Sequence, residues 1–211
     1  FTSLFAGLSS STALTLHFSR LSRDNPTLSP LLAAGILAAC GTMFPRILLV
    51  CLVLSPALAK PLFWPAGIMM LMLYGPAIAI WLRHRRSRID QPPLHQNPLE
   101  LKSALLFGLV LLIILVLAQV LRDAFGDTGL LLLAALSGIT DVDPVTLSVT
   151  RLANEGLEST TAVLAIIIAA SVNSLVKTGM AIGIADRGVG QRVGLVMSLA
   201  VATGLLSAWL I

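Results

Sequence analysis

Four charged side chains interrupt apolar stretches of this sequence, and they are the residues best suited to chemistry. Asp141 and Asp143 lie two positions apart in the segment 128–152, while Arg46 and Lys177 are each the one charge in a long apolar run. A charge at the centre of a bilayer costs about 2.5 to 3.5 kcal/mol on insertion scales, so each should meet a partner, an ion or water. Carboxylates suit hard cations such as Mg²⁺, whereas Arg and Lys suit anions or would pair with the carboxylates.

Neutral polar residues near these charges extend the candidate site. Asn173 lies one helical turn before Lys177, which makes it the better candidate for a direct neighbour of Asp141. The hydroxyl groups of the segment 7–21 are further candidate ligands, and the full set of neutral candidates is Asn173, Thr42, Ser10, Ser11 and Thr12.

Each charged residue also has a purely structural interpretation. Asp143 precedes Pro144, and this pair is typical of a helix start, where the Asp side chain caps free backbone N–H groups. Asp141 precedes that cap, so capping does not account for it. Arg46 and Lys177 could extend toward the outer interface of a membrane instead of lining a site.

The elements that must position these residues are apolar helices. The 211 residues are 56% hydrophobic and 11% charged, with a mean hydropathy of +0.93, whereas soluble domains are about 25% charged. This composition excludes a water-exposed monomer. A bilayer core about 30 Å thick needs about 20 apolar residues per helix, so the sequence predicts an all-α, polytopic integral membrane protein.

About seven spans are expected. The uncharged or singly charged stretches predict five complete spans, at Leu31–Leu54, Leu62–Leu82, Ser103–Leu121, Ser159–Ala185 and Val193–Ile211. Phe1–Leu21 and Thr128–Leu152 contain the polar clusters SSST and TDVD, and we interpret each as a discontinuous helix that crosses the membrane. Backbone breaks at such depth are tolerated only where they line protein or a wet cavity.

A basic run from Arg83 to Arg88 follows the second complete span and fixes the orientation. It accounts for much of the net charge of +4, and by the positive-inside rule it is cytoplasmic, so the charge does not indicate nucleic-acid binding. In this topology Asp186, Arg187 and Arg192 fall in an outer turn. The chain divides into repeat one (1–86), a cytoplasmic linker (87–99) and repeat two (100–211).

The two repeats are inferred from segments that match 131 positions apart. GLSSSTALTLHFSRL (Gly7–Leu21) and GITDVDPVTLSVTRL (Gly138–Leu152) share Gly, Thr, Leu, Arg and Leu. The same offset places four further pairs together: Arg46 with Lys177, Thr42 with Asn173, Ser10 with Asp141, and Thr12 with Asp143. An even number of predicted crossings separates the segments, so we expect parallel internal repeats. Repeat one then lacks a first helix, which predicts that the chain begins inside a longer protein.

Three segments carry a resemblance to a known family: GLSSSTALTLHFSRLSRDNP, GITDVDPVTLSVTRLA and ASVNSLVKTGMAIGIADRGVGQRV. They resemble a membrane domain of unknown function that occurs alone or C-terminal to an MgtC/SapB-type domain in bacterial and archaeal membrane proteins, and the likeness covers nearly the whole chain. The resemblance implies a multi-pass protein of the cytoplasmic (inner) membrane, magnesium-related physiology and an MgtC-like domain upstream. Pro144 departs from the Ala expected in the family's DVD-A pattern.

These observations predict an ion transporter or channel-like membrane protein, foremost for magnesium or another divalent cation bound by Asp141 and Asp143. Mg²⁺ would be the substrate, and no cofactor is expected. A small anion remains an alternative, since Arg46 and Lys177 would repel a cation and half-helix N-termini favour anions. A second alternative is a non-transporting partner or regulator of another complex. The sequence contains no HExxH, GxSxG or P-loop motif, so no enzyme is expected. The bilayer and further copies of the chain are the expected partners.

Overall fold

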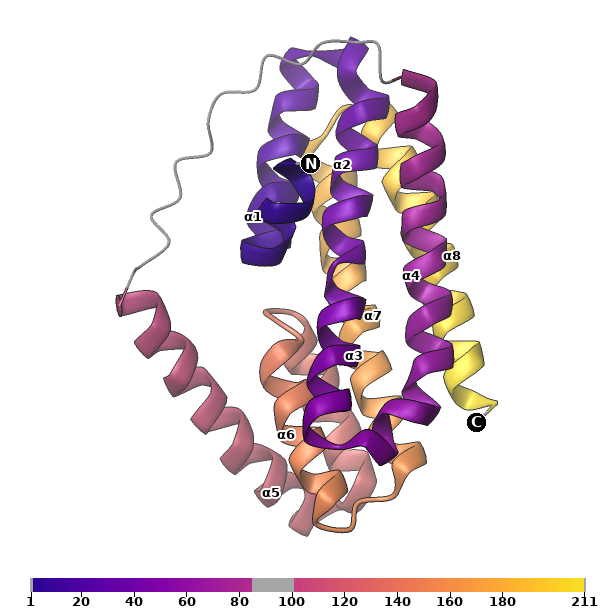
Figure 1. Cartoon of the computed structure of the whole chain (residues 1–211). Coiled ribbons are helices and arrows are strands. Elements are labelled where there is room, and N and C mark those ends of the chain that lie inside the picture. The colour runs from indigo at the N-terminus through magenta and orange to yellow at the C-terminus, as the bar shows by residue number, and fades with distance from the viewer. Residues whose placement is uncertain (1, 85–100, 211) are drawn as a thin grey trace.

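The structure is a computed structural model that describes residues 2–84 and 101–210, with the backbone alone for residues 2–10 and for part of 101–124. Over this part of the chain it is all-helical, as predicted (Figure 1). The elements in chain order are α1 (Thr2–Asp24), the 3₁₀ turn η1 (Pro26–Leu28), α2 (Ser29–Gly41), α3 (Met43–Leu54), α4 (Pro56–His84), α5 (Leu101–Gly138), α6 (Asp143–Asn154), α7 (Ser159–Ile184) and α8 (Arg187–Trp209).

Four helical stretches among the described residues are long and apolar enough to cross a membrane: Pro26–Leu54, Pro56–His84, Ser159–Ile184 and Arg187–Trp209. They coincide with four of the five complete spans predicted from the sequence. The fifth, Ser103–Leu121, is helical within α5, where many side chains lie outside the described set. The predicted linker at 87–99 also lies outside the described residues.

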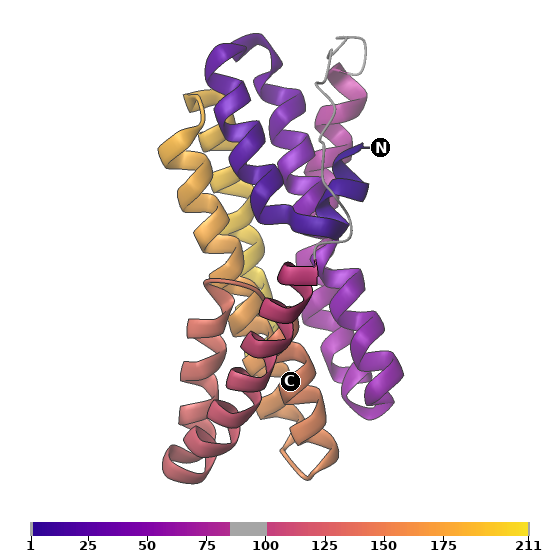
Figure 2. The ribbon, with the colours of Figure 1, turned by 90° about the vertical axis from the view of Figure 1, so that its left-hand side faces the viewer.

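The bundle core is built by α2, α4, α7 and α8, which pack side by side along its length (Figures 1 and 2). Small residues allow close approach, as is usual between membrane helices. A Cβ added at Gly204 of α8 would collide with Met69 of α4, and one added at Gly138 would collide with the backbone of Ala169 in α7. Large apolar side chains such as Leu52, Trp64 and Leu195 are exposed on the outside.

The segment 128–152 breaks where predicted but does not cross the bundle. The second part of α5 (127–138) runs parallel to α7, because Asp127 bonds Thr161 (3.1 Å) and the Gly138 carbonyl accepts a bond from Asn173 (2.9 Å). After the tip at 139–142 the chain returns as α6, which joins α7 through a short turn and is antiparallel to it. The segment is therefore a re-entrant hairpin, and the predicted crossing is wrong.

Helix length gives the physical reason. A helix of 12 residues, the length of α6, rises about 18 Å, which is too short for a bilayer core of about 30 Å. The segment 128–152 is therefore removed from the expected total of about seven spans. Another sharp turn lies at Gly126, whose positive φ of 59° separates α5 into two helices and is readily adopted only by glycine.

The first segment lies within α1, which extends from Thr2 to Asp24 and includes the SSST cluster. α1 bends sharply in its first part, so the N-terminus lies partway along the helix and not at its far end (Figures 1 and 2). No proline follows this cluster, in contrast to Pro144 in the second segment. The hydroxyl of Thr15 donates to the Ser11 carbonyl (2.8 Å), the back-bonding by which Ser and Thr are accommodated inside helices.

Helices that lie 131 positions apart run in opposite directions. α1 is parallel to α7, because contacts between them advance together from Ser11–Lys177 to Arg23–Gly183. α3 is likewise parallel to α6, with contacts that advance from Arg46–Asp143 to Leu54–Asn154. Since α2 returns antiparallel to α1, the continuous pair α2 and α3 runs opposite to α7 (Figure 1). The expectation of same-orientation repeats is therefore wrong.

This reversal also corrects the placement of the turn before α8. Asp186 donates its backbone N–H to Ser22 Oγ (3.0 Å), and Arg23 donates to the Gly183 carbonyl (3.2 Å). The turn therefore lies at the same end as the end of α1, and α4 also ends there (Figure 1). The predicted outer turn is wrong, and one end of the bundle gathers five arginines: Arg20, Arg23, Arg83, Arg187 and Arg192.

Candidate functional site

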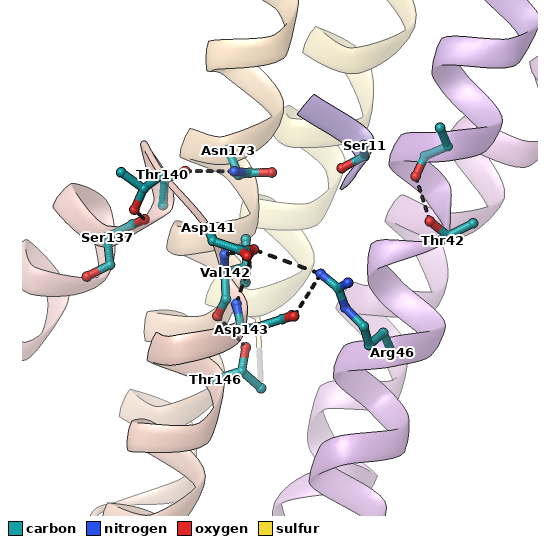
Figure 3. Close-up of polar contacts among 12 residues, drawn as sticks. Ser11, Thr42, Arg46, Ser137, Thr140, Asp141, Val142, Asp143, Thr146 and Asn173 are labelled. Carbon is teal, nitrogen blue, oxygen red and sulfur yellow. Dashed lines mark hydrogen bonds and ion pairs between the residues drawn. The ribbon is translucent and has the colours of Figure 1, made fainter. Parts of the chain in front are cut away.

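The tip of the re-entrant hairpin meets α3 in a charged cluster, which we define as Arg46, Asp141 and Asp143 (Figure 3). Arg46 Nη2 lies 2.9 Å from Asp143 Oδ2 and 3.8 Å from Asp141 Oδ1. One guanidinium thus faces two carboxylates from the other half of the chain. The alternative in which Arg46 extends to a membrane interface is wrong, because its side chain is held in an ion pair.

The local backbone explains why both carboxylates are present. Asp141 Oδ1 accepts the backbone N–H groups of Val142 (2.7 Å) and Asp143 (3.5 Å) at the beginning of α6. Asp143 is itself the first helical residue and is followed by Pro144. The capping role predicted for Asp143 therefore belongs to Asp141, which leaves the Asp143 carboxylate directed at Arg46.

Lys177 occupies a different environment from Arg46. Its side chain is buried, with 2% of the residue exposed, and Nζ donates to Ser11 Oγ at 2.8 Å. Lys177 therefore does not extend to an interface. Its hydrogen bond goes to a hydroxyl of α1 and not to either carboxylate.

Two of the neutral candidates, Asn173 and Thr42, support helices instead of entering the charged cluster. Asn173 is buried and donates to the Gly138 carbonyl, so it holds the end of α5 (Figure 3), and the prediction of direct contact with Asp141 is not met. Thr42 donates to the Ala39 carbonyl (2.6 Å) at the junction of α2 and α3. Thr12 is half-buried on α1, and the side chain of Ser10 lies outside the described set.

The charged cluster is partly open. The side chains of Asp141, Arg46 and Asp143 are 48%, 32% and 24% exposed. Among the described residues no group of three or more His, Cys, Asp or Glu side chains could hold a metal ion. Asp141 and Asp143 could therefore supply part of the coordination of a cation, with water completing the shell, which is the way Mg²⁺ is usually held.

Sequence reasoning missed a set of buried hydroxyls on both sides of this cluster. Thr15 and Thr150 are fully buried and approach the two cysteines: Cys40 Sγ lies 3.9 Å from Thr15 Oγ1, and Cys51 Sγ lies 3.5 Å from Thr150 Oγ1. The signal was available in the matched segments, because Thr15 aligns with Thr146 and Ser19 with Thr150.

Apolar spanning helices, a re-entrant hairpin and a partly open charged cluster together define a helical membrane protein with a polar centre. The family model described as "Domain of unknown function (DUF4010)" matches residues 1–185, and the chain belongs to this family. It is similar to an "Uncharacterized protein" of Aquifex aeolicus (strain VF5), with 33% identity over 186 residues that cover 86% of this chain and 80% of the relative. No solved structure matches the chain. The association with MgtC/SapB-type domains stays a prediction.

Proposed function

We propose that this protein moves a small cation across the cytoplasmic membrane, with Asp141 and Asp143 as the ligands that select it. The observation that carries the proposal is the charge of the exposed part of the site. Two carboxylates and one guanidinium are partly exposed, while the other central charge, Lys177, is buried. The accessible part therefore carries one net negative charge, which a cation complements.

Arg46 occupies the position that a transported cation would take. Its Nη2 already lies within contact distance of both carboxylates, so a cation must displace the guanidinium before it reaches them. Mg²⁺ fits this donor set because it is commonly bound by one or two carboxylates and retains several waters. Another divalent cation of similar chemistry would use the same ligands.

The arrangement of the helices supports transport over a static role. The two halves of the chain, matched in sequence and opposite in direction, are consistent with inverted repeats, and transporters of this kind bind substrate where such repeats meet. In this arrangement the arginine-rich end of the bundle is cytoplasmic by the positive-inside rule. In a partner protein without transport activity, we expect the charged side chains to be fully paired and shielded from water. Asp141 is about half exposed, which favours a site that a ligand can reach.

A small anion is the second candidate, and one observation favours it. Lys177 is a buried cation whose Nζ meets a hydroxyl, and α6 begins at the charged cluster, so its N-terminal dipole would favour negative charge there. An anion would bind on the Lys177 side of the cluster. It would not need the carboxylates.

The test is ion flux into proteoliposomes that contain the full chain. Mg²⁺ entry is followed with an internal indicator, and a panel of small anions is assayed separately, for the wild type, Asp141→Asn and Asp143→Asn. Asp127→Asn is the matched control, because Asp127 is an exposed carboxylate of α5 that accepts a hydrogen bond from Thr161 (3.1 Å) and lies outside the charged cluster. We expect Mg²⁺ flux in the wild type and in the control, and loss of at least about tenfold in both cluster variants, equivalent to about 1.4 kcal/mol. Anion flux that survives both substitutions would overturn the cation proposal in favour of the second candidate.

A further inference from the structure

Two rows of polar side chains run from the centre of the bundle toward opposite ends. The α1 row consists of Ser11, Thr15, Ser19 and Ser22, and the α6 row consists of Asp143, Thr146, Thr150 and Asn154. Spacings of three and four residues place each row on one helix face. Thr15 and Ser19 align with Thr146 and Thr150 in the matched segments, so the two rows use corresponding positions.

Five of the six hydroxyl side chains in the two rows are buried although they lie in apolar helices, and Ser11 is partly exposed. Thr15, Ser19, Ser22 and Thr150 have no exposed surface, and Thr146 is 1% exposed. Burying a hydroxyl costs free energy unless it is hydrogen-bonded. Thr146 and Thr150 donate to the carbonyls four residues earlier (2.9 and 2.6 Å), and Thr150 also lies 3.5 Å from Cys51 Sγ, so at least one lone pair of each hydroxyl oxygen is left for a ligand.

Ser19 provides an independent sign of a missing ligand. Its Oγ is buried and has no hydrogen-bond partner among the described residues. It lies between Thr15 and Ser22 on the α1 row, so its position predicts a water or an ion at this point of the row. Buried polar atoms without a partner are uncommon in folded proteins and require a specific explanation.

Each row runs from the centre of the bundle to one of its ends. The α1 row begins at Ser11, which receives the Lys177 bond, and ends at Ser22, which accepts the Asp186 backbone N–H. The α6 row begins at the charged cluster and ends at Asn154, which donates to the Leu54 carbonyl (2.9 Å). Because α1 and α6 run in opposite directions, the rows together traverse the bundle, with the charges where they meet.

We propose that the α1 row and the α6 row line the two halves of the route by which the transported ion reaches the charged cluster, the α1 row from the cytoplasmic end and the α6 row from the other end. This inference rests on the proposed function and adds the path to the site. Both rows are packed closed in this structure. Hydroxyl oxygens replace part of the ion's water shell when one row opens, and the opposite directions allow one end to open at a time.

The two native cysteines make this proposal testable without foreign reporters. Both are free and buried, and each approaches the middle of one row, Cys40 at Thr15 and Cys51 at Thr150. Cys51→Ser leaves Cys40 as a reporter of the α1 row, and Cys40→Ser leaves Cys51 as a reporter of the α6 row. The two variants are matched controls for each other.

The experiment labels each variant with a membrane-impermeant, cationic methanethiosulfonate reagent in spheroplasts and in inverted membrane vesicles. We expect Cys51 to react in spheroplasts and Cys40 in inverted vesicles, and millimolar Mg²⁺ to slow both reactions. Labelling in detergent-denatured protein gives the total thiol. Reaction of both cysteines from one side, or of neither under conditions that support transport, would overturn the proposal.

A second measurement separates failure of the route from failure of the proposed function. Thr15→Val and Thr150→Val remove one hydroxyl from each row, and Thr203→Val is the control, because Thr203 of α8 makes the same bond to the carbonyl four residues earlier (2.9 Å) outside the rows. We expect Mg²⁺ flux to fall about three- to tenfold in the row variants, the effect of one lost hydrogen bond, and to be unchanged in the control. Wild-type flux with unaffected row variants would overturn the route alone. Opposite-sided labelling without Mg²⁺ flux would overturn cation transport and leave the route.

Discussion

The contact between α3 and α6 and the contact between α1 and α7 have the same geometry and different chemistry. In each, a basic residue of a long helix meets the polar start of a row in the other half of the chain. Arg46 meets two carboxylates and is partly exposed, whereas Lys177 meets one hydroxyl and is buried. The comparison shows that the framework is shared by both halves, while the two carboxylates belong to one half.

The largest difference is expected from removing each basic side chain. Arg46→Met leaves two carboxylates without their partner, so it should destabilise the protein by about 2 kcal/mol, less than the 3 to 5 kcal/mol of a fully buried pair because these groups are partly exposed. Lys177→Met leaves only a hydroxyl and replaces a buried charge by an apolar side chain of similar length. Such replacements are often neutral or stabilising.

Thermal unfolding of both variants in detergent measures this contrast. Lys60→Met is the control, because Lys60 is an exposed cation near the start of α4. A shift in Tm to the same extent in the Arg46 and Lys177 variants would show that the two contacts are energetically equivalent.

A carboxylate placed in the α1 contact should reduce the difference between the halves. Thr12 corresponds to Asp143, so Thr12→Asp supplies Lys177 with the partner that Arg46 already has. We expect a coupling of about 1.5 kcal/mol between the new carboxylate and Lys177, the lower end of the range for charge-assisted hydrogen bonds.

A double-mutant cycle of Thr12→Asp and Lys177→Met, followed by thermal unfolding, isolates this coupling. The same cycle with Leu16→Asp, one turn further along α1, is the matched control. An equal effect of Thr12→Asp with and without Lys177 would contradict the pairing.

The smallest difference between the two halves is expected at the starts of α4 and α8, the helices that follow α3 and α7 in the chain. Asp186 precedes α8 and Ser55 precedes α4 at the corresponding position. Burial acts to raise the pKa of Asp186, but hydrogen bonds from Ser29 and from the N–H groups of Gly188 and Val189 together hold this pKa below the ordinary value of an aspartate. The ionised carboxylate therefore stabilises the folded state above pH 4, and this contribution is lost as the pH falls through the lower folded pKa.

Thermal unfolding between pH 3 and pH 6 tests the assignment. We expect the Tm of the wild type to fall at the acid end more steeply than that of Asp186→Asn. Ser55→Ala should leave the pH dependence unchanged, because a hydroxyl does not titrate in this range. If the Tm of the wild type and that of Asp186→Asn fell equally steeply at the acid end, Asp186 would not be the cause of this pH dependence.

Composition and run length predicted the helical class and four of the spans, because hydropathy records burial in lipid directly. The break at Asp143-Pro144 was also readable, since proline at a helix start leaves a local signal. The reversal at the tip was not readable. A 25-residue apolar segment with a central break has the same composition whether it crosses or returns, and the return depends on contacts such as Asn173–Gly138.

The candidate site was also predictable only in part. The charges within apolar stretches identified Arg46, Asp141 and Asp143 as residues that need partners, and in the structure both carboxylates face the guanidinium of Arg46. The partner of Lys177 was misjudged because the predicted topology ran the helix 159–185 opposite to the segment 1–21, whereas α1 and α7 are parallel and bring Ser11 to Lys177. The hydroxyl rows were missed because Ser and Thr carry little hydropathy signal, although their recurrence 131 positions apart was present in the sequence.

The hairpin tip at 139–142 has a consequence for biogenesis. Non-helical backbone is tolerated at membrane depth only where protein surrounds it, and Asn173 supplies the bond that holds the end of α5. Asn173 is translated after the hairpin, on α7. The bond that holds the end of α5 can therefore form only after α7 has been synthesised, so the charged tip of the hairpin depends on a helix that follows it in the chain.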